Sequence, residues 1–64
     1  MSEATDAAAV VAGALARRSP ADRARFLREL LAHTVAGLVV IEGDRAAGEA
    51  VYRLADAVVA RGSN

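Results

Sequence analysis

The chain has 64 residues, no cysteine, a formal net charge of zero and a hydrophobic content of 55%, to which alanine is the largest contributor. Its length allows one small domain, near the lower limit of what folds alone. The lack of cysteine excludes disulfides and thiolate metal sites, so association with another chain is the remaining common source of stability. The zero net charge gives no overall attraction to nucleic acid or to an anionic membrane.

The N-terminal segment is acidic, with Glu3 and Asp6, and it lacks the basic region that a secretory signal requires. The longest stretch without a polar side chain is 7–16. That length is about half of the roughly 20 residues that a helix needs to cross a bilayer. We therefore expect a cytoplasmic protein without a membrane-spanning segment.

A first helix is expected over residues 4–18. Ser2 or Thr5 can cap its N-terminus, and Arg17 with Arg18 places two cations near its negative C-terminal end. The polar-free stretch within this helix leaves it without a polar face, which predicts burial on several sides at once. We therefore expect a homodimer interface centred on this helix.

A second helix is expected over residues 20–42. Ser19 is a favoured N-cap residue, and Pro20 suits the first helical position, where its missing N–H is not needed. Asp22 stands where the acid of a capping box reaches back to the cap residue. These three residues predict a well-defined start.

The second half of this helix is less uniform, because Gly37 and the β-branched residues 39–41 disfavour a helix. A short strand is the alternative there. The apolar register nevertheless continues without a break, and one strand would have no partner within the chain. We therefore predict a continuous helix, in which Gly37 is tolerated, relaxes the helix, or admits a neighbouring backbone.

A third helix is expected over residues 44–61. Gly43 suits a left-handed position that ends the second helix, and Asp44 suits the N-cap of the third. Gly62 is the expected stop. Only short connections therefore join the predicted helices.

Each predicted helix carries apolar residues at alternating spacings of three and four, which places them on one stripe that needs a partner. The stripes are Ala4, Ala8, Val11, Leu15; Ala24, Leu27, Leu31, Thr34, Leu38, Ile41; and Ala47, Val51, Leu54, Val58. The expected fold is all-α: a small three-helix bundle, or a helical hairpin with a docked N-terminal helix, completed by homo-oligomerisation. The candidate oligomer interface consists of Ala8, Val11, Leu15, Leu27, Leu31 and Leu38.

No group of residues in the sequence indicates catalysis. His33 is the single histidine, with Glu29 one turn before it, but no nucleophile, oxyanion donor or second ligand accompanies them. Glycine-rich phosphate loops, EF-hand spacing and H-E-x-x-H are absent. We therefore expect no enzyme, no cofactor and no metal site, and a His33 that faces solvent or an interface, with a pH-sensitive contact as the alternative.

Basic residues crowd the corner between the first two helices. Five of the eight arginines lie there, namely Arg17, Arg18, Arg23, Arg25 and Arg28. Arginines clustered in this way can bind the phosphates of nucleic acid, although Asp22 and Glu29 offset their positive charge. We name these five residues the arginine corner and take it as a candidate partner-binding surface.

The chain has two aromatic residues, Phe26 and Tyr52. Phe26 shares a stripe with Leu30 and is expected in the core. Tyr52 is expected to be half-buried beside the stripe of the third helix, with an exposed binding anchor as the alternative. Tyr52 therefore joins the arginine corner as a candidate partner contact.

Together these features favour a non-enzymatic protein–protein interaction or regulatory module that is a homodimer and has a protein partner. The alternative is a small dimeric nucleic-acid-binding regulator that uses the arginine corner. Neither interpretation involves a membrane.

Overall fold

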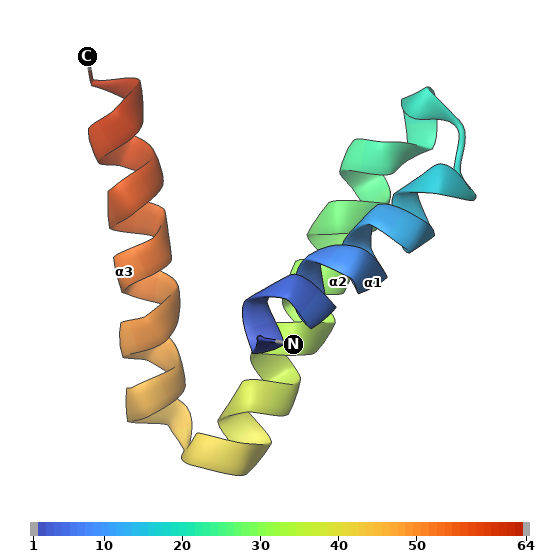
Figure 1. Ribbon diagram of the computed structural model, residues 1–64. Coiled ribbons are helices and arrows are strands. Elements are labelled where there is room, and N and C mark those ends of the chain that lie inside the picture. The colour runs from blue at the N-terminus through green and yellow to red at the C-terminus, as the bar shows by residue number, and fades with distance from the viewer. Residues whose placement is uncertain (1, 64) are drawn as a thin grey trace.

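The computed structural model describes residues 2–63 and consists of three helices joined by short turns (Figure 1). They are α1 (Glu3–Ala16), α2 (Pro20–Glu42) and α3 (Asp44–Gly62). The described part of the chain contains no strand, which confirms the prediction of an all-α protein with three helices. In Figure 1, α2 and α3 diverge as the two arms of an open V, and a short turn joins α1 to the far end of the α2 arm.

α1 begins with a side-chain cap. The Ser2 hydroxyl oxygen accepts a hydrogen bond from the Thr5 backbone N–H at 3.1 Å, so Ser2 is the N-cap of the two candidates. The helix ends at Ala16, with Arg17 as its C-cap, two residues earlier than expected. Arg17 and Arg18 therefore lie in the turn to α2, and neither is in the last helical turn.

Ser19 occupies the N-cap position of α2 and Pro20 its first helical position, but the predicted capping box is absent. The Ser19 hydroxyl donates to Asp22 Oδ2 at 3.0 Å, and its oxygen accepts no hydrogen bond from a helix N–H. The turn is thus held by a bond between the two side chains.

α2 is continuous through Gly37 and residues 39–41, and the alternative strand does not form. A Cβ atom at Gly37 would meet nothing within 4 Å. No other part of the described chain therefore approaches Gly37 closely. Val40 and Ile41, near the end of α2, are among the most exposed large apolar residues.

Gly43 alone links α2 to α3. It has φ 91° and ψ 165°, a conformation essentially restricted to glycine. Its N–H donates to the Val39 carbonyl at 2.8 Å, and its carbonyl accepts from the Ala47 N–H at 3.1 Å. Gly43 is thus the C-cap of α2 and also the N-cap of α3, and Asp44, predicted as that cap, is the first helical residue.

The end of α3 also differs from the prediction. Gly62 belongs to the helix and has no positive φ, so it does not act as a left-handed stop. Ser63 is the C-cap, and its hydroxyl donates to the Val59 carbonyl at 2.9 Å. A side-chain hydrogen bond to an unpaired carbonyl therefore replaces the expected glycine cap.

Burial within one chain is slight. Among residues 2–63, the buried apolar residues are Ala14, 8% exposed, and Ala47, fully buried, and no large side chain is fully buried. Ala14 lies in α1 and Ala47 at the joint of α2 with α3. The many-sided burial predicted for the first helix is not provided by a single chain, in which Val10 is exposed. One copy is therefore an open hairpin of α2 and α3, preceded by α1.

Candidate functional site

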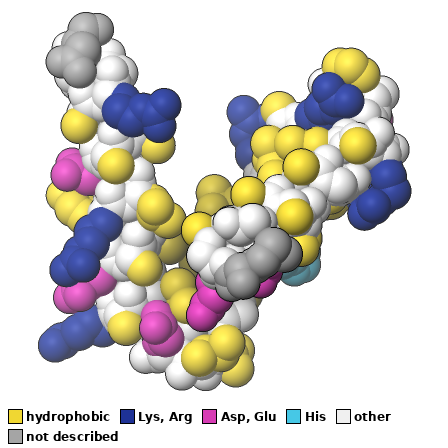
Figure 2. All heavy atoms as spheres, in the orientation of Figure 1, with side chains coloured by type: hydrophobic (Ala, Val, Ile, Leu, Met, Phe, Trp, Pro, Cys, Tyr) yellow, Lys and Arg dark blue, Asp and Glu magenta, His cyan; other side chains and the backbone are white. Residues whose placement is uncertain are grey.

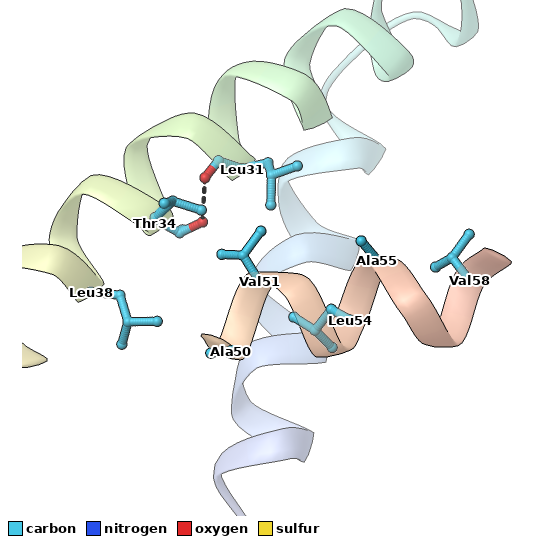
Figure 3. Close-up of a pocket in the computed structure, with 9 residues that line it drawn as sticks. Leu31, Thr34, Leu38, Ala50, Val51, Leu54, Ala55 and Val58 are labelled. Carbon is cyan, nitrogen blue, oxygen red and sulfur yellow. Dashed lines mark hydrogen bonds between the residues drawn. The ribbon is translucent and has the colours of Figure 1, made fainter. Parts of the chain in front are cut away.

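An apolar groove of about 530 Å³ lies between α2 and α3 (Figure 3). Its α2 wall consists of Leu31, Thr34, Val35 and Leu38. Its α3 wall consists of Ala50, Val51, Leu54, Ala55 and Val58. We call these nine residues the α2–α3 groove. Figure 2 shows apolar side chains on the inner sides of both arms.

The two apolar stripes meet in this groove because each has helical spacing. Residues three and four apart share one face of a helix, so Leu31 and Leu38 lie on the same side of α2. Val51 and Leu54 do the same on α3. In Figure 3, Leu31 and Val51 point toward one another across the groove. The turn at Gly43 therefore brings both stripes to the same opening.

The groove offers no polar group to a ligand. None of its lining residues is charged, and its one polar side chain is Thr34. The Thr34 hydroxyl already donates to the Leu31 carbonyl at 2.9 Å within α2. An occupant would consequently be selected by its apolar shape, because burying an unpaired polar group there is unfavourable.

Only part of the groove was predicted from the sequence. Of the predicted interface residues, Leu31 and Leu38 line the groove. The others, Ala8, Val11, Leu15 and Leu27, lie outside it. Four further groove residues stand on the predicted stripes but were not predicted as interface, namely Thr34, Val51, Leu54 and Val58. Val35, Ala50 and Ala55 were not predicted at all, and they flank the stripes by one position. The sequence gives little indication of these three residues, because they line the groove only as a result of the angle between α2 and α3.

The arginine corner is partly engaged in contacts within the chain. The Arg18 guanidinium lies over the Phe26 ring, 3.5 Å from its centroid, and Arg23 Nε donates to the Leu15 carbonyl at 3.1 Å. Both contacts join the α1 end of the turn to α2. Phe26 is half-buried beneath Arg18 and does not lie in a closed apolar core. A cation–π partner for the arginines was not predicted.

A shallow depression of about 390 Å³ at this corner has mixed charge. It is lined by Arg18, Asp22, Arg25, Phe26 and Glu29. The carboxylates of Asp22 and Glu29 therefore lie among the arginines and would repel a phosphate bound there. The remaining members of the corner, Arg17 and Arg28, are exposed.

Replacing Arg18 with alanine is expected to lower the free energy of unfolding by about 0.5–1 kcal/mol, because the cation–π contact with Phe26 is lost. Urea denaturation at fixed protein concentration measures this change. Arg17→Ala is the matched control, since Arg17 is exposed, and it should change stability by less than about 0.5 kcal/mol. Equal effects of the two substitutions would contradict a stabilising role for Arg18.

Tyr52 and His33 line neither the α2–α3 groove nor the depression at the arginine corner. Tyr52 is 72% exposed, so the prediction of a half-buried ring is wrong and the alternative of an exposed aromatic remains. His33 is exposed on α2, and its expected neighbour Glu29 is exposed as part of the depression at the arginine corner. Within residues 2–63 no three side chains are grouped as a metal site would require.

No protein-family model, curated protein or solved structure matches the chain. None of the described helices combines the length and apolar character needed to cross a membrane. The chemistry of the groove and of the arginine corner thus carries the functional interpretation.

Proposed function

We propose that this protein is a small, non-enzymatic helical module that acts through protein–protein contacts as a homodimer. The supporting observation is its accessible surface of 5422 Å². A folded monomer of 6.6 kDa is expected to expose about 3,900 Å². One copy therefore exposes about 1,500 Å² more than a compact monomer of its size.

This excess matches the size of a permanent interface. Obligate homodimers commonly bury about 2,000–5,000 Å² in total, or about 1,000–2,500 Å² from each chain. The exposed surface also includes many large apolar side chains, which monomeric proteins rarely gather in large patches. They are Val10, Leu27, Leu31, Val40, Ile41, Tyr52, Leu54, Val58 and Val59.

Other parts of the proposal rest on the sequence. Tyr52 and the exposed arginines are candidate contacts for a further protein partner, because aromatic residues and arginine are enriched at binding hot spots. The cytoplasmic location remains a prediction. Nucleic-acid binding is less well supported, since Arg18 and Arg23 already make contacts within the chain, and Asp22 and Glu29 share one depression with Arg18 and Arg25.

The mass of the full chain in solution tests the proposal. Sedimentation equilibrium between about 1 and about 100 μM is expected to give twice 6.6 kDa, because a permanent interface of this size is usually saturated at such concentrations. Circular dichroism of the same samples reports whether the helices are formed. A fully helical 6.6 kDa monomer across this range would overturn the proposal.

A further inference from the structure

We infer that α3 of a second copy fills the α2–α3 groove, and that the two chains do this reciprocally, with α2 and α3 of each chain forming one core. The inference rests on the proposed homodimer and specifies its surface. A homodimer could instead form through α1, which contributes no residue to the groove.

The exposed face of α3 is self-complementary. In a two-fold symmetric dimer, the same surface patch lies on both sides of the interface. α3 meets this condition, because Leu54 and Val58 line the groove and are also largely exposed, and so can enter a partner's groove. The same face of α3 can therefore line the groove of its own chain and occupy the groove of the partner, so the dimer requires no other surface.

The groove and the apolar stripe of α3 match chemically. The groove walls carry no charge, and their one hydroxyl is hydrogen-bonded internally. An occupant must therefore present a helix stripe without charges, at spacings of three and four residues. Val51, Leu54 and Val58 are such a stripe, and every second copy supplies it. Ala50 and Ala55 beside them are small, which permits close helix approach.

The surface that one copy exposes is large enough for a stable dimer interface. One copy exposes about 1,500 Å² more than a compact monomer would, and a stable dimer needs roughly 800 Å² or more from each partner. The groove walls include exposed residues that contribute to this excess, such as Leu31 and Leu54. Seating a helix between the arms would cover both walls at once.

Two adjacent valines provide a matched test. Val58 and Val59 are both 65% exposed and stand side by side in α3, but only Val58 lines the groove. Val58→Asp is expected to raise the dimer dissociation constant on the order of 100-fold, because an unpaired carboxylate would be buried. Val59→Asp should change it by less than about threefold, since surface substitutions have small effects. Sedimentation equilibrium of the full chain measures both.

A second measurement covers the case in which Val58→Asp prevents folding. The natural sequence has no cysteine, so Val58→Cys and Val59→Cys can each carry a single nitroxide label. Electron paramagnetic resonance of the dimer should show an immobilised label at position 58 and a mobile one at position 59. Equal mobility at the two positions would overturn the inference.

The outcomes also separate this inference from the proposed homodimer. A dimeric wild type in which Val58→Asp and Val59→Asp behave alike overturns the groove as the interface and leaves the homodimer standing. Dissociation by Val11→Asp would then place the interface at α1. A folded wild-type monomer overturns both proposals and leaves the groove to an apolar helix of another protein.

Discussion

A hundredfold dilution is expected to lower the midpoint of thermal unfolding of the wild-type chain by about 10 °C. The reason is that one copy buries little more than Ala14 and Ala47, so most of the apolar core would exist only in the dimer. Unfolding is then coupled to dissociation, and mass action makes the stability depend on concentration.

The size of the shift follows from two quantities. A hundredfold change in concentration is worth about 2.7 kcal/mol at room temperature. Unfolding two chains of 64 residues releases an entropy of about 0.27 kcal/mol/K, at about 2.1 cal/mol/K per residue. The ratio of these values gives the expected shift in the midpoint.

Far-UV circular dichroism during heating, at about 1 and about 100 μM, measures the midpoints. A tandem chain, in which a flexible linker joins two copies, is the control, because its association is intramolecular and its midpoint should not move. A wild-type midpoint that is equally independent of concentration would show that one copy is stable alone.

Gly43→Ala is expected to lower the free energy of unfolding by about 1–3 kcal/mol, because Gly43 has a φ of 91° that a residue with a Cβ atom rarely adopts. The cost is conformational and not steric, since a Cβ atom there would meet nothing within 4 Å. Displacing Gly43 would also disturb its bonds to Val39 and Ala47, which cap both helices.

Gly37→Ala is the matched control, with the opposite sign. Gly37 lies inside α2, and an added Cβ atom there meets nothing in the same chain, so alanine should raise stability by about 1 kcal/mol. Urea denaturation of both variants at one protein concentration measures the difference. If Gly43→Ala left the free energy of unfolding unchanged, the positive φ of Gly43 would be contradicted. A destabilising Gly37→Ala would show that a second copy approaches α2 at that glycine.

Local signals were sufficient to predict the helices. Pro20 and Gly43 mark both breaks, and the unbroken apolar register explains why α2 continues through residues 39–41. The caps were less predictable, because several residues at each end could serve. Gly43 replaces Asp44 at the start of α3, and the Ser19 hydroxyl turns to Asp22.

The groove could be predicted only in part, for a physical reason. Helical spacing shows that Leu31 and Val51 each need an apolar partner, but it does not fix the angle between their helices. That angle depends on the backbone conformation of Gly43, and it determines whether Val35 and Ala55 become walls or stay at the surface.

The short connections between helices have a consequence for the kinetics of folding. A turn of residues 17–19 and the single residue Gly43 join neighbouring helices, so contacts within one chain are mainly between segments close in sequence. Helical chains dominated by such local contacts fold in microseconds to milliseconds. The encounter of two chains, with typical rate constants of about 10⁵–10⁷ M⁻¹s⁻¹, is then the slower step at micromolar concentration. The rate at which native protein forms would therefore increase with the amount of chain present.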